Sequence, residues 1–396
     1  MNTLVILSES TMTFIYLTEV IMKKIRIVIA DHEKSYIESL SNYLRSSDEA
    51  TRFISTYFTS KTALQQFLSS NEVVDVMLIS PALYDKSLHI PKETSLIFLD
   101  DNEMKEQDTH RQSVYRYQRL NQLISNILAI YYENNQQAGK LLARSKQTEV
   151  LTVYSPLGGT GKSTVAANLS KQLAQNNLKV FYLNLELFNS TSIYFQSEED
   201  NPSLQIFYFV KSESPQLLSK IESLKKYDAY SKVSYFDIAI SADELLEISE
   251  DDVKRLINGI VGTGTYDYIV VDLDSSMHER NIAALKECDR IIWPITNDEQ
   301  SYLKTVSFLA EEAKLIGKEN VIKDKLLLIM NKFYGDSRNN VNDYNLTIDG
   351  YLPLVESWLG IQPGKMILNN DLYNQELLAM IHERILVKEG NVVNVG

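Results

Sequence analysis

The sequence predicts an α/β protein built from two doubly wound parallel-sheet domains. Three observations support this prediction. Strand-like and helix-like segments alternate through the first third of the chain, a glycine-rich loop between a strand and a helix opens the remainder, and the polar residues 133–148 separate the two patterns. We therefore expect residues 1–21 to be a loose extension, 22–132 one domain, 133–148 a linker and 149–396 a second domain.

The composition is typical of a globular protein, with 44% hydrophobic and 23% charged residues. The net charge of −13 disfavours nucleic acid and anionic membranes as general partners, although it leaves room for a local basic patch. The single cysteine, Cys288, excludes an intrachain disulfide and fits a reducing, cytoplasmic setting. Because Cys288 directly precedes an apolar run, we expect its thiol to be buried and inert.

The first residues suggest a targeting segment, but Glu9 and Glu19 interrupt their apolar character and no basic cluster precedes them. The segment that starts at Met22 reads like a natural beginning, so residues 1–21 are either a start-site artefact or an extension. No other stretch has the roughly twenty apolar residues that a membrane-spanning helix needs. We expect no direct insertion into a membrane.

Strands and helices alternate in the first predicted domain. Buried-strand patterns cover residues 25–30, 52–57, 73–79 and 95–99, and helical patterns cover 33–44, 61–69 and 118–132. This alternation predicts a parallel sheet with helices on both faces.

Near its start the second domain has a predicted phosphate-binding stretch, residues 154–165, between a β-branched strand and a helix of apolar periodicity that starts near Lys162. Glycines allow such a loop to wrap a polyphosphate with its backbone N–H groups, and the following helix adds its positive end. The ammonium group of Lys162 would reach the β- and γ-phosphates, and the Ser163 hydroxyl would bind Mg²⁺. The predicted nucleotide-binding residues are Gly158, Gly159, Thr160, Gly161, Lys162, Ser163 and Thr164. The first position of the usual motif is Pro156 instead of glycine.

Four further strands are predicted at residues 178–183, 266–272, 290–296 and 325–331. Polar residues stand at or just after the ends of three of these strands. Glu186 follows the first strand, Asp272 ends the second and Asn331 ends the fourth. Taken alone, Asp272 is a strand cap and Asn331 a turn former. Because a phosphate-binding loop lies about a hundred residues earlier in the chain, Asp272 is better explained as the carboxylate that holds a Mg²⁺-bound water.

These motifs resemble the ParA/MinD family of ATPases over about residues 147–390. The resemblance implies ATP and Mg²⁺ as cofactors, Lys162, Glu186 and Asp272 as catalytic residues, and Ser163 and Asp272 at the metal. It also implies that Asn331 contacts adenine. Most members carry a lysine where this chain has Leu157, and that lysine crosses to the partner's nucleotide. We therefore expect slow hydrolysis, and a homodimer held by other contacts.

The first domain resembles the receiver domain of response regulators over about residues 22–132. Ser80 stands where the family has its phosphate-accepting aspartate, Asp31 keeps one acidic position, and Arg116 stands near the family's lysine. A serine cannot form the acyl phosphate, so we expect a pseudo-receiver that docks partners. An unrelated flavodoxin-like domain without a regulatory role remains the alternative.

Together the two domains resemble the TadZ/CpaE family, with Arg116 to Arg119 adding to the match. The resemblance implies an ATP-binding factor that localises assembly of a Tad (Flp) pilus secretion machine, cytoplasmic or recruited to the membrane or cell pole through partners. There are three alternatives. The first is a DNA or cargo segregation ATPase, which needs a basic surface. The others are a tyrosine-phosphorylating relative and a membrane-cycling ATPase. Residues 388–396 lack the tyrosine cluster of the kinases, and we expect residues 377–386 to pack on the core.

Ser249 and Asp252 predict a capping box for a helix through Ile260.

Overall fold

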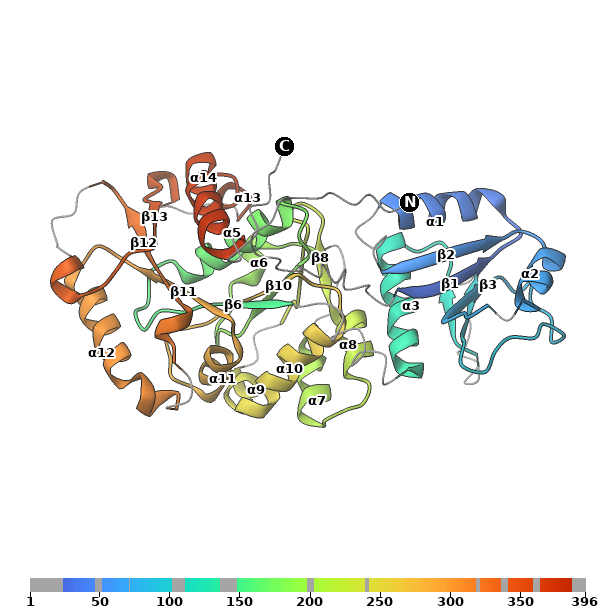
Figure 1. Ribbon diagram of the computed structural model, residues 1–396, viewed down its shortest axis with the longest axis horizontal. Coiled ribbons are helices and arrows are strands. Elements are labelled where there is room, and N and C mark those ends of the chain that lie inside the picture. Colours follow the sequence, from blue (N-terminus) through green and yellow to red (C-terminus); the bar gives the residue numbers. More distant parts are fainter. Residues whose placement is uncertain are drawn as a thin grey trace, which may run out of the picture.

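The computed structural model describes residues 24–46, 52–70, 72–101, 111–135, 148–197, 203–238, 242–317, 321–335, 341–358 and 364–386. These residues form two α/β domains that lie end to end (Figure 1). The predicted extension 1–21, most of the predicted linker and the segment 388–396 lie outside the described residues. Among the described helices, none has both the length and the apolar character needed to cross a bilayer.

The first domain contains a five-stranded, fully parallel sheet with the strand order β2-β1-β3-β4-β5. This order belongs to the doubly wound flavodoxin-like class, as the alternating sequence pattern predicts. Its strands are β1 Ile25–Ala30, β2 Phe53–Phe58, β3 Val76–Ile79, β4 Ser95–Asp100 and β5 Ser113–Tyr115. Its helices are α1 Lys34–Ser46, α2 Lys61–Leu68 and α3 Leu120–Asn134.

Residues of β1 alternate between the two faces of this sheet, as the period of a strand requires. Ile27 and Ile29 join α1 and α3 in one apolar cluster, whereas Val28 and Ala30 join α2 in another. Strand β5 was not predicted because only Val114 of its three residues is buried, so it has no apolar run. Helix α3 ends two residues inside the predicted linker.

The second domain contains an eight-stranded sheet with the order β13-β12-β11-β6-β10-β7-β9-β8, parallel except for β8. The predicted strands are confirmed, and the short strands β8, β9 and β13 were not foreseen. The strands are β6 Glu149–Val153, β7 Val180–Asn184, β8 Lys226–Asp228, β9 Val233–Tyr235, β10 Tyr268–Asp272, β11 Arg290–Ile295, β12 Leu326–Phe333 and β13 Gly350–Pro353.

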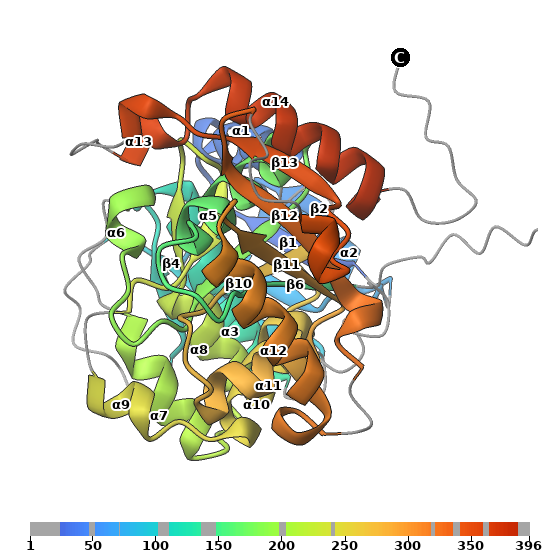
Figure 2. The same ribbon diagram turned by 90° about the vertical axis from the view of Figure 1, so that its left-hand side faces the viewer.

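Helices cover both faces of this sheet (Figure 2). One apolar cluster joins the sheet to α7, α8, α10, α11 and α12, and the other joins it to α5 and α14. The helices are α5 Lys162–Gln175, α6 Thr191–Tyr194, α7 Ile206–Lys211, α8 Leu217–Leu224, α9 Ala242–Leu246, α10 Glu250–Gly262, α11 Glu279–Glu287, α12 Glu299–Leu315, α13 Gly364–Ile367 and α14 Asp371–Met380. Short 3₁₀ turns cover Ser203–Gln205, Lys323–Lys325, Val341–Tyr344 and Glu356–Trp358, and a π-helix covers Ile381–Leu386.

Three local predictions for this domain are confirmed. Ser249 caps α10 with a capping box that is completed by the Asp252 side chain. Leu377 and Ile385 are fully buried, as expected for a segment that packs on the core of this domain. The Cys288 thiol is also buried, and burial raises its pKa to about 12, which makes it a poor nucleophile at neutral pH.

The two domains meet through α3 of the first and α8 of the second (Figure 1). Leu218 of α8 packs against the apolar core of the first domain. The buried Tyr132 hydroxyl of α3 donates a hydrogen bond of 2.9 Å to the Thr263 carbonyl of the second domain. The interface therefore combines apolar burial with directed polar contacts.

Candidate nucleotide-binding site

The glycine-rich loop lies between the carboxyl end of β6 and the amino end of α5, in the middle of the eight-stranded sheet. Open α/β sheets bind ligands at the carboxyl edge of their strands, so this is the expected position for a site. Helix α5 starts at Lys162, with Gly161 as its N-cap, so its positive end faces the loop.

Two glycines of the loop adopt backbone conformations that other residues rarely take. Gly159 has φ of 78° and Gly161 has φ of 89°, both in the left-handed region. A Cβ atom on Gly161 would lie 2.4 Å from Asn331 Nδ2, whereas one on Gly158 or Gly159 would meet nothing within 4 Å. Gly161 thus allows Asn331 to pack closely against the loop. The opposite, outer side of the loop, at Gly158 and Gly159, is open.

Side chains from the end of β12 hold the loop in place. The Asn331 amide donates to the Thr160 carbonyl at 2.8 Å, and its own oxygen accepts from the Tyr373 hydroxyl at 3.3 Å. Lys332 Nζ donates to the Gly159 carbonyl at 2.7 Å. The structure thus places Asn331 against the loop, and its contact with adenine stays a prediction.

Lys162 is mostly buried, and its ammonium group donates to Ser275 Oγ at 2.7 Å and to the Leu157 carbonyl at 3.4 Å. Burial lowers the pKa of Lys162, although Asp272 and Glu186 counteract this effect. A bound phosphate would further stabilise the charged form, because it places negative charge beside the ammonium group. The sequence did not single out Ser275, which lies after β10 and reaches the lysine only in the folded chain.

Asp272 ends β10 and is fully buried. One of its oxygens, Oδ2, accepts a hydrogen bond of 2.8 Å from the Tyr182 hydroxyl, while Oδ1 has no hydrogen-bond partner among the described residues. Burial, reinforced by the nearby carboxylate of Glu186, raises the pKa of Asp272 well above its ordinary value. A cation or a cation-bound water would satisfy the unpaired oxygen and offset the buried charge.

Glu186 follows β7 and is held by the Asn184 side chain. Asn184 Oδ1 accepts from the Glu186 backbone N–H at 2.8 Å, and Asn184 Nδ2 donates to Glu186 Oε2 at 3.4 Å. Burial raises the pKa of Glu186, whereas hydrogen bonds from Asn184 and Ser163 lower it. The nearby Ser163 hydroxyl and the Lys162 charge also lower the pKa of Asp272, so the fold brings the four predicted groups Lys162, Ser163, Glu186 and Asp272 together.

The oxygen ligands at this position fit Mg²⁺. Magnesium in nucleotide sites usually takes one or two protein oxygens and completes its shell with phosphate oxygens and water. Ser163 and Asp272 would supply the protein oxygens. Within the described ranges no three His, Cys, Asp or Glu side chains converge to hold a metal by themselves.

Asp274 adds a further acidic group that the sequence analysis did not include in the site. It forms an ion pair with the buried Arg280 and accepts a hydrogen bond of 2.7 Å from Asn281. Burial raises the pKa of Asp274, but hydrogen bonds from Ser276 and the charge of Arg280 outweigh it and lower the value to about 2. These contacts fix the chain between β10 and α11, which carries the Ser275 partner of Lys162.

A phosphate-cradling loop at a helix start, a buried lysine and a carboxylate with an open coordination position define a P-loop nucleotide-binding domain. Residues 148–327 match the family model AAA_31, which is described as an AAA domain. The C-terminal part of the chain is thus similar to this AAA domain family in sequence. Its fold is that of a ParA family ATPase from Chlorobium tepidum TLS, with a TM-score of 0.50, 20% identity, and coverage of 60% of this chain and 100% of the other.

Two curated proteins are also similar to the chain. One is an uncharacterized ATP-binding protein of Methanocaldococcus jannaschii, 24% identical over 169 residues, or 42% of this chain and 60% of that protein. The other is Protein Thf1 of Prochlorococcus marinus, 32% identical over 109 residues, or 26% of this chain and 54% of that protein. The chain thus spans little more than half the length of the curated relatives that it matches.

Proposed function

We propose that this protein is an ATP-binding, slowly hydrolysing factor that localises or assembles a Tad-type pilus or secretion machine. In this proposal the second domain binds ATP and Mg²⁺, a homodimer forms, and the first domain docks partner proteins at the inner membrane face. The observation that carries the proposal is the combination of a phosphate-binding loop that keeps Gly161, Lys162 and Ser163 with leucine at position 157.

ATP binding is supported by the geometry of the loop and of Lys162. The loop is open on its outer side at Gly158 and Gly159, and the Lys162 ammonium lies at its base. The ATP γ-phosphate would take over the contact that Lys162 now makes with Ser275. Glu186 would position the attacking water, and Asp272 would hold a water on the Mg²⁺ ion.

Slow hydrolysis is proposed because charge on the transferring phosphoryl group must be stabilised in the transition state. Lys162 supplies such a charge from within the loop, but Leu157 adds none. A chain that binds ATP tightly and hydrolyses it slowly stays in its ATP state for a long time, which suits an assembly factor.

A docking role for the first domain is supported by the contacts of Arg116. Its guanidinium lies 3.3 Å from Asp31, 2.8 Å from Glu33 and 3.2 Å from Asp101. Arg116 therefore neutralises the acidic group that would bind Mg²⁺ in a phosphate-accepting domain. Ser80 follows β3 and is 1% exposed, which leaves its hydroxyl inaccessible to a phosphate donor.

The oligomeric state tests the nucleotide-dependent part of the proposal. We would measure the sedimentation velocity of the full chain without nucleotide, with ADP-Mg²⁺ and with ATP-Mg²⁺, alongside Lys162→Ala. We expect a dimer that depends on ATP and is lost in Lys162→Ala. A mass that does not respond to nucleotide would remove the switching role. Imaging a fluorescent fusion in host cells with and without the pilus machine tests the localisation.

The ParA-type fold makes DNA or cargo segregation the second candidate. Segregation ATPases that act on DNA need a surface that binds phosphates without sequence preference. Filter binding with random duplex DNA at low salt separates the two functions. Tight retention that falls steeply with salt would favour segregation, and no retention would favour the assembly factor.

A further inference from the structure

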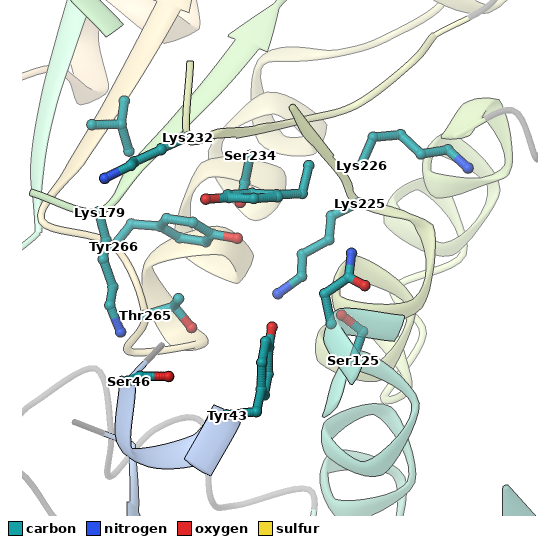
Figure 3. Close-up of a pocket in the computed structure, with 13 residues that line it drawn as sticks. Tyr43, Ser46, Ser125, Lys179, Lys225, Lys226, Lys232, Ser234, Thr265 and Tyr266 are labelled. Atoms are coloured by element: carbon teal, nitrogen blue, oxygen red, sulfur yellow. The ribbon is translucent and has the colours of Figure 1, made fainter. Parts of the chain in front are cut away.

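The carboxyl half of β7 carries two buried polar side chains, Tyr182 and Asn184, next to the candidate nucleotide site. They are two positions apart in the strand, so they lie on the same face of the sheet. In the parallel register of β7 with β10, Asn184 lies opposite Asp272. At the amino end of β7, Lys179 and Val180 line a cavity between the two domains (Figure 3). Tyr182 and Asn184 therefore face the nucleotide site and not that cavity.

The Tyr182 hydroxyl contacts the carboxylate that would hold a Mg²⁺-bound water. It donates a hydrogen bond of 2.8 Å to Asp272 Oδ2, and it accepts one of 3.2 Å from Asn184 Nδ2. A phenol has a single hydrogen to donate, and an amide nitrogen donates without accepting. The hydrogen of Tyr182 is therefore directed at Asp272, and the Asn184 amide fixes this direction.

The orientation of the Asn184 amide is set by the chain that follows it. The backbone N–H of Glu186, which can only donate, is 2.8 Å from Asn184 Oδ1. The amide nitrogen is thereby left to donate to the Tyr182 hydroxyl and, at 3.4 Å, to Glu186 Oε2. An ionised aspartate at this position has the same shape but could make neither contact, because it has no hydrogen to donate.

A chain of hydrogen bonds thus joins two carboxylates of the site. It runs from Asp272 through Tyr182 and Asn184 to Glu186. The Tyr182 ring is held by Phe195, with the ring centroids 4.9 Å apart. Because the ring and the amide are both buried and held, the two carboxylates keep a fixed arrangement.

We propose that Tyr182 and Asn184 are positioning residues for Mg²⁺ and ATP. By binding Oδ2 of Asp272, Tyr182 leaves the other oxygen, Oδ1, to serve the cation-bound water. Through Asn184 the same contacts hold Glu186, so the carboxylate at the metal and the carboxylate at the attacking water keep one relative geometry. This role rests on the proposed binding of ATP and Mg²⁺ by the second domain.

The Mg²⁺ dependence of nucleotide binding by the full chain tests this role. A fluorescent ATP analogue is titrated in EDTA and at a series of Mg²⁺ concentrations, with the wild type and with Tyr182→Phe, which removes only the hydroxyl. We expect Tyr182→Phe to need about tenfold more Mg²⁺ for half of its effect, because one hydrogen bond to a charged group is lost. Its affinity in EDTA should change by less than about twofold. Tyr208→Phe changes an exposed tyrosine of α7 and is the control, which should alter neither quantity.

Asn184→Ala tests whether the two residues act together. It removes the amide that directs the Tyr182 hydroxyl and that holds Glu186. We expect the Mg²⁺ requirement to rise about fivefold, the effect of a neutral hydrogen bond. In the double variant, the rise should be smaller than the product of the two separate effects, since both substitutions break the same chain of contacts.

The possible results separate this role from the proposed function. An unchanged Mg²⁺ requirement in Tyr182→Phe, or separate effects that multiply in the double variant, overturns the positioning role even though the wild type binds ATP. A Tyr182→Phe variant that loses affinity equally in EDTA and in Mg²⁺ also overturns it, because the hydroxyl would then support only the fold. A wild type that binds the analogue under neither condition overturns the proposed function as well.

Discussion

The side-chain amide of Asn331 donates a hydrogen bond of 2.8 Å to the carbonyl of Thr160, a residue 171 positions earlier in the chain. This contact joins the end of β12 to the nucleotide loop. It holds the Thr160 carbonyl, and with it the backbone of the loop, in place. The loop conformation therefore depends on a neighbouring strand as well as on its own glycines.

Replacing Asn331 by alanine should weaken ATP binding roughly fivefold, the effect of one lost hydrogen bond. Titration with fluorescent ATP and GTP analogues measures the change, and Gln300→Ala, which removes an exposed amide at the start of α12, is the control. An equal loss for both nucleotides supports positioning of the loop. A loss confined to ATP supports the contact with adenine instead.

Gly161→Ala should abolish nucleotide binding and lower the free energy of unfolding by about 1–3 kcal/mol, because φ is 89° and the new Cβ would contact Asn331. Gly158→Ala is a matched control in the same loop, since its Cβ would meet nothing within 4 Å. Urea denaturation and ATP titration of both variants measure the two effects. Similar behaviour of the two variants would show that the backbone at Gly161 is not the determining feature.

Leu157→Lys should increase the rate of ATP hydrolysis at least about tenfold, because it introduces a positive charge beside the transferring phosphoryl group. Steady-state phosphate release with ATP and Mg²⁺ measures the rate. Leu157→Met, which keeps the apolar character, is the control and should leave the rate unchanged. If Leu157→Lys hydrolyses no faster, another feature of the site limits the reaction.

Asp272→Asn should raise the thermal midpoint of the nucleotide-free protein at pH 7 and weaken Mg²⁺-dependent ATP binding. The folded protein raises the pKa of this buried carboxyl, so the folded state binds more protons than the unfolded state. Stability therefore falls as the pH rises above about 3.9, the ordinary value, and the fall continues to the raised pKa. Thermal melts between pH 4 and 8, with the exposed Asp237→Asn as control, measure this slope. A steeper slope in Asp272→Asn than in the wild type would contradict the prediction.

Glu222→Gln should destabilise the contact between the domains by about 3 kcal/mol, because it removes the buried carboxylate that pairs with both Arg52 and Lys225. Burial raises the pKa of Glu222, but Lys225 and Arg52 outweigh this effect and lower it to about 2. Its contribution is thus present above the ordinary carboxyl pKa and lost as the pH falls toward about 2. Denaturation at pH 7 and pH 3 compares wild type with Glu222→Gln and with the exposed Glu311→Gln. The difference between wild type and Glu222→Gln should shrink at pH 3.

The fold could be predicted from the sequence wherever a strand is long and buried on both faces. Strands β1, β6 and β10 are of this kind, and their apolar runs are visible without a structure. Strands β8 and β9 have three residues each, including Lys226, Asp228 and Ser234, so nothing in their composition distinguishes them from a loop. Their pairing with the sheet depends on neighbours that are distant in the sequence.

The same limit applies to the candidate site. The sequence identifies the positions of Lys162, Ser163, Glu186 and Asp272, because each lies in a local motif or near the end of a predicted strand. No motif or strand end identifies the residues that contact them, such as Tyr182 and Ser275. Tyr182 reaches Asp272 because β7 and β10 are adjacent and in register, with Tyr182 two positions before the strand end. Adjacency in the sheet is a property of topology and not of the local sequence.

Leu218 belongs to the second domain but fills part of the core of the first. A chain shortened to end after α3 would leave the α3 face that packs on Leu218 open to water, and the Tyr132 hydroxyl would lose the Thr263 carbonyl to which it donates. Such a fragment would tend to self-associate through this face. A dimer observed for the isolated first domain would therefore be a product of the cut, and the two halves should be studied on an intact chain.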